Sequence, residues 1–366
     1  MVDAESFKGW AGVDEKACEG KLEFQSFEVK PWDEDDVDVK ILYCGICGSD
    51  ASALSGEWGP VKDSVPQICG HEIVGEVIRV GEKIENGIKL GQLVGIGAQS
   101  DSCRECGDCK AHNENFCPKQ TITFNQTFNR GNGKGSISRG GFAKYWRGPS
   151  RFAIPIPDGI DPAVAAPLLC GGVTVYTPLE RYGAGTKAKN VGIIGVGGLG
   201  HMAILLANAM GANVTAISRS DSKQKDAEKL GARAYIATGD DVQAALKPHA
   251  RSLDLIICTS NPPKFPVADY MSLIRPEGTF CFVGIAPEPL EVPTFPLITG
   301  TIAIAGSYIG SPDTIARLFK FVSEKKVEPW IQKWDMDDIN KAMPAFQRGD
   351  PKYRFVLVNT DNGGKV

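Results

Sequence analysis

The stretch VGIIGVGGLGHMAILLANAMGANVTAIS, at residues 191–218, determines the fold of the middle of the chain. It contains an apolar strand pattern, the glycine pattern GVGGLG, an apolar helix pattern and a second strand pattern. In such a turn Gly195 makes the tight bend, Gly197 lets backbone approach a pyrophosphate, and Gly200 lets the helix pack on the strand. The helix N-terminus also offers N–H groups and partial positive charge to phosphates. The stretch therefore predicts a dinucleotide site, and the alternative is a glycine-rich turn without a ligand.

The rest of the chain shows two kinds of secondary-structure pattern. Strand and helix patterns alternate from about 170 to 307, as in a parallel sheet of βαβ units. Residues before about 165 instead contain short strands, such as 72–81, between glycines and prolines. The last residues add an amphipathic helix at 314–325 and a closing strand at 353–359. We therefore expect an α/β protein that combines a β-rich domain with a Rossmann-type, doubly wound parallel sheet.

Length and composition agree with two domains in an ordinary globular enzyme. The 366 residues exceed what one hydrophobic core usually organises, and we place the domains at 1–168 with 309–366 and at 169–308. The formal net charge is −4 and no basic block occurs, which argues against a nucleic-acid partner. The first residues lack a signal-peptide pattern, and no uninterrupted apolar stretch reaches the ~18 residues of a membrane span. We therefore expect a cytoplasmic protein with no membrane partner.

Four of the eleven cysteines form one short run. Cys103, Cys106, Cys109 and Cys117 are separated by two, two and seven residues on a segment rich in charge. Four thiolates suit one tetrahedral Zn²⁺ with no open position, so the run predicts a structural zinc site. The alternatives are a polar loop with free thiols and a disulfide pair, and the second suits a secreted chain.

A second set of metal-ligating residue types is spread over the first half of the chain. Cys47 lies in CGICGSD, His71 and Glu72 lie in CGHEIVGE, and Cys170 lies in PLLCGGVTVY. Two thiolates and one imidazole leave a fourth tetrahedral position open, which is the stoichiometry of a catalytic zinc. Each residue alone also fits a buried core position.

The residues after the second strand indicate which dinucleotide binds. An acidic side chain at this point would bind the ribose 2′-OH of NAD, but the strand ends in Ser218, with Arg219 beside it and Lys223 one turn on. These groups suit a 2′-phosphate and predict NADP(H) rather than NAD(H). Asp221 weakens the prediction, and the alternative is that both cations are solvated surface charges.

Taken together and in this order, these motifs resemble the zinc-dependent medium-chain alcohol dehydrogenases. The phrases GHEIVG, APLLCGGVTVY, ISRS and YRF are similar to those of the cinnamyl alcohol dehydrogenase branch, especially its NADP-dependent fungal members. The resemblance covers nearly the whole chain and implies a GroES-like catalytic domain, a Rossmann domain, NADP(H), two Zn²⁺ per chain and a homodimer.

The resemblance also implies roles for individual residues. The catalytic zinc would lie on Cys47, His71 and Cys170, with Glu72 able to join them when substrate is absent, and the Ser49 hydroxyl would touch the substrate oxygen. The residues implied near NADP(H) are Thr174, Gly195, Val196, Gly197, Gly198, Leu199, Ser218, Arg219, Lys223, Val283, Gly284, Ile285, Ser307, Tyr308, Ile309 and Arg354. Trp58, Tyr308 and Ile309 would line an apolar substrate mouth. The chain departs from many relatives at Ser52, where they carry a proton-relay histidine.

The expected function is the reversible reduction of aromatic or medium-chain aldehydes to primary alcohols by hydride transfer from NADPH. Three alternatives stay open. They are an NAD-dependent polyol dehydrogenase, a reductase of activated C=C bonds that needs no zinc, and a nucleotide-binding protein that is not an enzyme.

Overall fold

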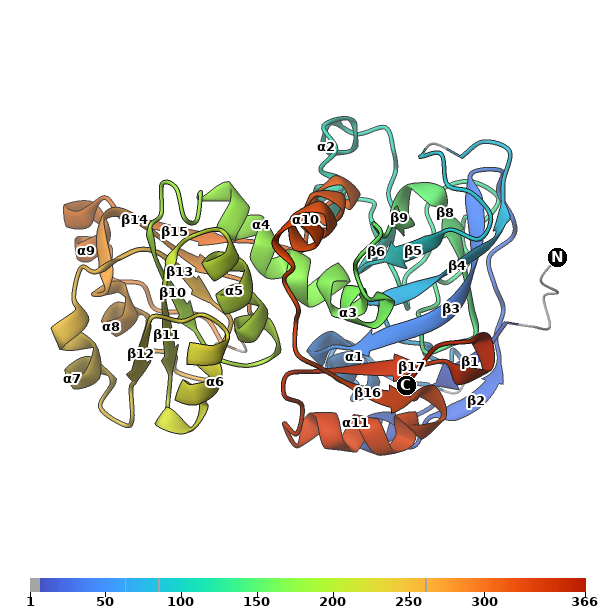
Figure 1. The fold of residues 1–366 in the computed structure, drawn as a ribbon. Helices are drawn as coiled ribbons and strands as arrows, with labels where there is room; N and C mark the ends of the chain where they lie inside the picture. The colour runs from blue at the N-terminus through green and yellow to red at the C-terminus, as the bar shows by residue number, and fades with distance from the viewer. Residues whose placement is uncertain (1–6, 63, 85, 261, 287) are drawn as a thin grey trace. The chain divides into compact units, whose positions relative to one another are not determined.

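The computed structural model describes residues 7–62, 64–84, 86–260, 262–286 and 288–366 (Figure 1). The chain divides into two compact units. The first comprises Met1–Val173, Gly310–Lys326 and Trp330–Val366, and the second comprises Thr174–Ile309 and Val327–Pro329. The limits expected after residues 168 and 308 lie five residues and one residue before those of the two units, which end at Val173 and Ile309. The first six residues, for which no leader was expected, lie outside the described part.

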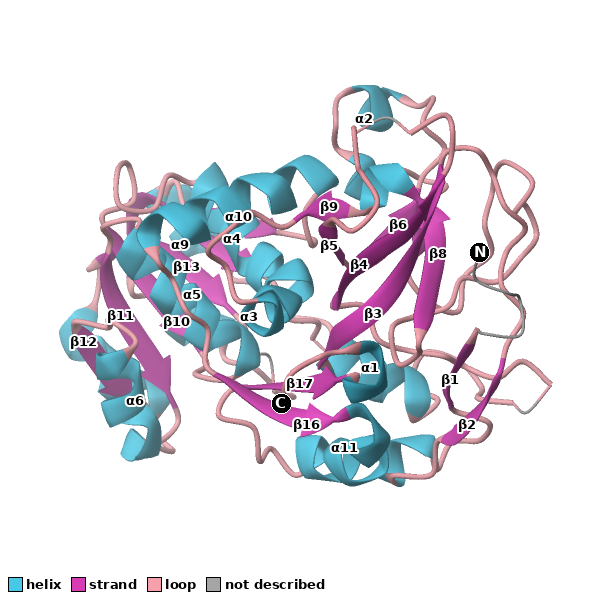
Figure 2. Cartoon of the chain, turned by 45° about the vertical axis from the view of Figure 1, so that its right-hand side comes forward, coloured by secondary structure: helices cyan, strands magenta, loops and turns pink. Residues whose placement is uncertain are grey.

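A seven-stranded, mostly antiparallel sheet organises the first unit (Figure 2). Its order is β16-β17-β3-β4-β5-β9, with β8 paired to β3 as well. The strands are β3 (Asp36–Ile46), β4 (Ile73–Val80), β5 (Leu93–Ile96), β8 (Tyr145–Pro149), β9 (Ile154–Pro155), β16 (Ile331–Asp335) and β17 (Arg354–Val358). Val37, Val39 and Ile41 of β3 are fully buried, so the longest strand carries much of the core.

The other strands and helices of this unit lie outside this sheet. They are β1 (Lys8–Ala11), β2 (Glu23–Ser26), α1 (Gly48–Leu54), β6 (Gln99–Asp101), α2 (Gly107–Lys110), β7 (Thr121–Ile122), α3 (Pro162–Pro167), α10 (Pro312–Lys325) and α11 (Ile339–Gln347). The amphipathic helix expected at 314–325 is α10, and the expected closing strand is β17. α10 begins where the Ser311 hydroxyl accepts a hydrogen bond from the Thr314 N–H at 3.3 Å.

The helical segment from α3 into α4 (Val173–Arg181) contains a π-helical turn over Leu168–Gly172. The segment begins at Pro162, where Asp161 accepts a hydrogen bond from the Ala163 N–H at 2.8 Å. By length and composition Pro162–Arg181 could cross a membrane, which the sequence analysis did not predict. However, 83% of its most apolar window is buried in the structure, as in core helices that meet the same criterion.

The second unit is a six-stranded parallel sheet in the order β12-β11-β10-β13-β14-β15. The strands are β10 (Asn190–Ile194), β11 (Asn213–Ser218), β12 (Ala234–Ala237), β13 (Leu253–Cys258), β14 (Ile274–Phe282) and β15 (Ala303–Gly306). The helices between them are α5 (Gly198–Ala209), α6 (Gln224–Lys229), α7 (Val242–Leu246), α8 (Val267–Met271) and α9 (Thr294–Gly300). This is the strand order of a Rossmann sheet: successive strands are added on one side of β10 up to β12 and then on its other side from β13 onward. The predicted fold is therefore confirmed.

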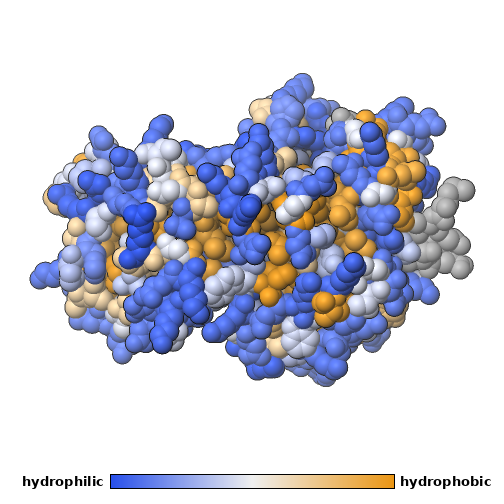
Figure 3. Space-filling view, in the orientation of Figure 1, coloured by the Kyte–Doolittle hydropathy of each residue, from blue (hydrophilic) through white to orange (hydrophobic). Residues whose placement is uncertain are grey.

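The polar and apolar residues are distributed as expected for a globular chain. Hydrophilic residues cover most of the face drawn in Figure 3, with apolar residues visible between them. The second unit has its own apolar core, which includes Ile217, Ile256 and Phe280, each fully buried. Each unit therefore carries the core that a domain needs.

Candidate active site

Cys47, His71, Glu72 and Cys170 come together in the first unit. Their ligand atoms all lie within 4.8 Å of one another, and all four residues are buried. Ligands at ~2.0–2.3 Å from one tetrahedral Zn²⁺ are separated by roughly 3.3–3.8 Å, and His71 Nε2 lies 3.2 Å from Cys170 Sγ. The group therefore fits a zinc ion with little movement.

Three separate segments bring these ligands together. Cys47 follows β3 and precedes α1, whereas His71 and Glu72 lie just before β4. Cys170 lies in the π-helical turn, a feature that often marks a functional site. The hydrogen bond from the Cys170 thiol lowers the pKa of Cys47 well below its usual value despite burial, while the same bond raises that of Cys170. This bond favours the thiolate form of Cys47, which is the form that binds metal.

Asp50, which the sequence analysis did not predict as a site residue, orients the His71 ring. Its Oδ1 lies 2.9 Å from His71 Nδ1 and accepts the Gly70 N–H at 2.9 Å, and its Oδ2 accepts the Cys47 N–H at 2.9 Å. Because a carboxylate oxygen accepts, Nδ1–H donates to Asp50 and Nε2 is the ring nitrogen that faces Cys170. Burial disfavours the charged ring, but the Asp50 carboxylate raises the pKa of His71 well above its usual value.

Glu72 and Arg354 form a buried ion pair beside this group. The Arg354 guanidinium binds Glu72 Oε1, whereas Glu72 Oε2 is buried and has no hydrogen-bond partner among the described residues. Burial raises the pKa of Glu72 to about 7, although Arg354 opposes the shift. A side chain at Gly45 would collide with Oε2. Glu72 Oε2 could therefore serve as a fourth, exchangeable metal ligand.

The structure places the other predicted site residues of the first unit as follows. Ser49 Oγ lies 4.0 Å from Cys47 Sγ. Ser52 is half-buried one turn further along α1, and Trp58 is 49% exposed in the turn after this helix. Arg354, expected near the cofactor, lies on β17 and joins the metal group through Glu72. Its contact with cofactor stays a prediction.

The four-cysteine run forms a second compact group. The ligand atoms of Cys103, Cys106, Cys109 and Cys117 also lie within 4.8 Å of one another, and no disulfide forms among them. Burial disfavours the Cys103 thiolate, yet backbone N–H donors lower the pKa of Cys103 to about 7. The Cys106 N–H points to Cys103 Sγ at 3.3 Å, and the Lys119 N–H points to Cys117 Sγ at 3.4 Å. Such donors stabilise thiolates around one metal ion, so the group fits a structural zinc.

The glycine turn of the second unit has the form that a dinucleotide needs. Gly195 has a φ of +91°, and a Cβ there would meet Ser260 and Thr259 at 2.8 Å. A Cβ at Gly200 would collide with the Gly195 carbonyl, so the helix must pack closely at this point. Among the described residues, a Cβ at Gly197 would meet nothing within 4 Å, and no side chain caps the N-terminus of α5. Open space beside uncapped N–H groups fits a pyrophosphate.

The residues predicted to select NADP(H) follow β11. Ser218 ends this strand, Arg219 is exposed, and the Lys223 ammonium donates a hydrogen bond to the Val196 carbonyl of the glycine turn at 2.7 Å. The ends of the two neighbouring strands β10 and β11 therefore lie together, as the prediction requires.

The remaining predicted cofactor residues lie at three places in the second unit. Thr174 is buried at the start of α4, Val283 to Ile285 follow β14, and Ser307 to Ile309 follow β15. The Ser307 hydroxyl is buried without a hydrogen-bond partner in the described part of the chain. Tyr308 is 46% exposed, whereas Ile309 is buried and its carbonyl accepts a hydrogen bond from Thr177 at 2.9 Å. Ends of parallel strands are where such folds bind ligands.

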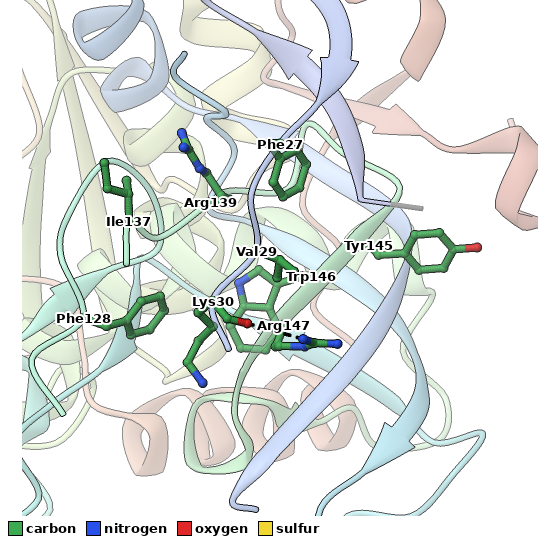
Figure 4. A pocket seen from close by; sticks show the side chains of 9 residues that line it. All are labelled: Phe27, Val29, Lys30, Phe128, Ile137, Arg139, Tyr145, Trp146 and Arg147. Atoms are coloured by element: carbon green, nitrogen blue, oxygen red, sulfur yellow. Dashed lines mark hydrogen bonds between the residues drawn. The ribbon is translucent and has the colours of Figure 1, made fainter. Parts of the chain in front are cut away.

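A small cavity elsewhere in the first unit does not belong to either metal group (Figure 4). Its volume is about 10 Å³, which is room for about one water molecule. It is lined by Phe27, Val29, Lys30, Phe128, Ile137, Arg139, Tyr145, Trp146 and Arg147. Arg147 donates a hydrogen bond to the Lys30 carbonyl at 3.3 Å, so part of this lining is already paired.

Comparison with known proteins agrees with this geometry. Residues 33–158 match the alcohol dehydrogenase GroES-like domain, and residues 198–324 match the zinc-binding dehydrogenase family. The chain is 40% identical over 350 residues to 8-hydroxygeraniol dehydrogenase of Catharanthus roseus, covering 95% of this chain and 94% of that one. It is 39% identical over 338 residues to NADP-dependent alcohol dehydrogenase 6 of Saccharomyces cerevisiae, covering 92% of each. A solved cinnamyl alcohol dehydrogenase from Sorghum bicolor superposes with a TM-score of 0.88 at 36% identity, covering 98% of each chain.

The fold and its cysteine-containing groups define an oxidoreductase that combines a metal site with a dinucleotide site. The chain belongs to the zinc-dependent medium-chain alcohol dehydrogenases, and cinnamyl alcohol dehydrogenases are among its relatives. The predicted family, fold and enzyme class are therefore confirmed.

Proposed function

We propose that the protein reduces aromatic or medium-chain aldehydes to primary alcohols with NADPH, and catalyses the reverse reaction. The observation that carries this proposal is the buried group of Cys47, His71, Glu72 and Cys170, whose ligand atoms lie within 4.8 Å of one another. When bound there, zinc would supply Lewis acidity toward a carbonyl oxygen, and NADPH would supply the hydride.

The protein's own residues then act on orientation and on protons. Asp50 fixes the His71 ring, and Arg354 holds Glu72 through one carboxylate oxygen. The Ser49 hydroxyl, 4.0 Å from Cys47 Sγ, donates a proton to the substrate oxygen during reduction and accepts it back during oxidation. Burial of all four ligands keeps water from surrounding the group and strengthens its electrostatic effect.

We propose NADP(H) as the cofactor because cations and a hydroxyl follow β11. Ser218, Arg219 and Lys223 suit a 2′-phosphate, and the exposed Arg219 side chain can provide two parallel hydrogen bonds to it. The yeast relative is named as an NADP-dependent enzyme, which supports the same choice.

We also propose two zinc ions per chain, one in each cysteine-containing group. The four thiolates of the run from Cys103 to Cys117 close the coordination shell of their ion, so it would support the fold. The group at Cys47 would keep an exchangeable position for substrate. These two different ligand sets support two different roles.

The substrate range is tested by initial rates. An aldehyde panel that contains cinnamaldehyde, benzaldehyde and linear aldehydes, assayed with NADPH, should give turnover with at least one aromatic or medium-chain member. Sorbitol with NAD⁺ and an activated enone with NADPH serve as the comparison reactions. Turnover confined to either comparison reaction would replace the proposal with a polyol dehydrogenase or a C=C reductase.

Homodimer formation and a cytoplasmic location belong to the same proposal. The strand β15 lies at the edge of the second sheet, and the preceding helix α9 exposes 75% of Phe295 and 76% of Ile298. Exposed apolar residues next to an open strand edge support pairing with a second copy. Eleven free thiols suit a reducing compartment. Light scattering after size exclusion tests the first part, and cell fractionation tests the second.

A further inference from the structure

Three successive backbone carbonyls at the end of β11 accept hydrogen bonds from one neighbouring segment. The Ser218 carbonyl accepts the Thr238 N–H at 2.9 Å, and the Arg219 carbonyl accepts the Gly239 N–H at 2.9 Å. The Ser220 carbonyl accepts the Tyr235 hydroxyl at 2.6 Å. Residues 218–223, called the selectivity loop below, are thus attached to β12 and to the turn that follows it.

The third of these bonds differs from the other two. The first two come from backbone N–H groups that continue the parallel pairing of β11 with β12, where Ser218 lies opposite Ala237. Ser220 lies beyond the last paired residue, so the ladder no longer holds its carbonyl. The Ser220 carbonyl is bound instead by a long side chain, that of Tyr235 on β12, through its hydroxyl.

The Tyr235 hydroxyl is also in contact with both ends of the selectivity loop. It interacts with the Ser218 side chain and with the Lys223 backbone. The residue is half-buried, and burial raises the pKa of its hydroxyl. The hydroxyl therefore keeps its proton at neutral pH and remains a donor to Ser220.

These contacts matter for a negatively charged ligand. A carbonyl oxygen that points toward a phosphate repels it, and a loop that is free to rotate must lose conformational entropy before it can bind. The Ser218, Arg219 and Ser220 carbonyls are instead hydrogen-bonded to β12 and the turn after it. This pairing reduces both the repulsion of the phosphate and the conformational entropy that the loop loses on binding.

We propose that Tyr235 is a specificity-determining positioning residue, which holds the selectivity loop in the conformation that recognises the 2′-phosphate of NADP(H). This inference rests on the proposed preference for NADP(H). Tyr235 acts through the loop backbone and needs no contact with the cofactor itself.

Binding of two cofactor fragments tests the inference without zinc chemistry or turnover. 2′-Phospho-ADP-ribose and ADP-ribose differ only in the phosphate, and isothermal titration calorimetry gives the ratio of their affinities. Loss of one net hydrogen bond should make Tyr235→Phe bind the phosphorylated fragment roughly three- to tenfold more weakly. Binding of ADP-ribose should change less than about twofold.

Tyr176→Phe is the matched control variant. It removes a tyrosine hydroxyl that bonds Glu180 at 3.1 Å within α4 of the same unit. It should leave the ratio of the two affinities unchanged. Circular dichroism and the melting temperature confirm that both variants are folded.

Each other outcome has a definite meaning. Equal binding of the two fragments by the wild-type protein contradicts the proposed NADP(H) preference itself. A wild-type preference that Tyr235→Phe fully retains overturns the role of Tyr235 alone. An equal loss for both fragments in Tyr235→Phe also overturns it, since that result indicates general support of the fold.

Discussion

Asp50 and His71 form a buried pair in which Asp50 Oδ1 lies 2.9 Å from His71 Nδ1, leaving Nε2 as the ring atom that faces Cys170 at 3.2 Å. The Asp50 carboxylate thereby fixes the ring orientation in which Nε2 faces the other ligands before any metal arrives. The same carboxylate accepts backbone N–H groups at Gly70 and Cys47, so one side chain connects the two segments that carry Cys47 and His71.

Asp50→Asn should weaken zinc binding at the Cys47 group. Loss of a partner of this kind typically lowers metal affinity by about 10- to 100-fold. Competition with a chromophoric chelator measures this effect on the intact protein. The four-cysteine group provides the internal control, because its zinc should be retained at the wild-type level. Equal loss from both groups would show that Asp50 supports the fold as a whole.

Metal content separates the roles of the two groups. Elemental analysis of protein never exposed to chelator should give two zinc ions per chain. Cys106→Ser should lower the melting temperature, since a closed thiolate shell contributes directly to folding. Cys47→Ser should abolish turnover and leave the melting temperature much closer to that of the wild type. One zinc or none in the untreated protein would contradict the two-site proposal.

Arg219→Ala should raise the Michaelis constant for NADPH on the order of tenfold, because charge-assisted hydrogen bonds contribute ~1.5–3 kcal/mol each. The value for NADH should stay nearly unchanged. Arg233→Ala is a suitable control, since Arg233 is also exposed but precedes β12 at the opposite end of the parallel strands. Equal losses with both cofactors in Arg219→Ala would indicate a structural role.

Ser52 should make alcohol oxidation dependent on high pH. It lies three residues after Ser49 on α1, so the two side chains share a helix face, but a serine cannot hold a charge near neutral pH. Wild-type oxidation should be slow near neutrality and rise with pH, while aldehyde reduction proceeds. Ser52→His should speed neutral oxidation more than reduction. Fast oxidation in the wild type that is independent of pH from about 6 to 9 would refute this relay argument.

Asp36 should contribute a pH-dependent part of the stability. Burial raises the pKa of Asp36 to about 6 although Lys30 opposes the shift. Because the pKa of Asp36 is higher in the folded protein than in the unfolded chain, protonation of Asp36 stabilises the folded state. This stabilisation is fully present below the unfolded pKa near 3.8 and is lost as pH rises through about 6. Relative to Asp36→Asn, the wild type should therefore be more stable at about pH 5 than at about pH 7.5, by on the order of 1 kcal/mol.

Asp33→Asn is the matched control for that measurement. Asp33 binds the same lysine at 3.2 Å, but backbone donors and Lys30 lower its pKa despite partial burial. Both its folded and unfolded pKa values lie below the tested range, so this variant should show little change between the two pH values. Chemical denaturation of the three proteins gives the free energies of unfolding. A wild-type difference that matches the control would contradict the raised pKa.

Much of the fold could be predicted because its signals are local. The GVGGLG turn and the alternation around it specify β10, α5 and β11 within one short stretch, and the ligands Cys47, His71 and Cys170 occur in recognisable motifs. The Glu72–Arg354 pair was not predicted, since its members are 282 residues apart and meet only through the pairing of β17 with β3. The first domain limit was expected after residue 168, whereas the units divide after Val173, within the same helical segment that contains Cys170.

The π-helical turn at Leu168–Gly172 has an evolutionary consequence. A π turn holds one more residue than an α turn, and one residue corresponds to about 100° of rotation around a helix axis. Deletion of a single codon before Cys170 would restore a regular helix and turn the thiol away from His71. We expect such a deletion to remove the metal ion and, with it, the Lewis acidity proposed for this site.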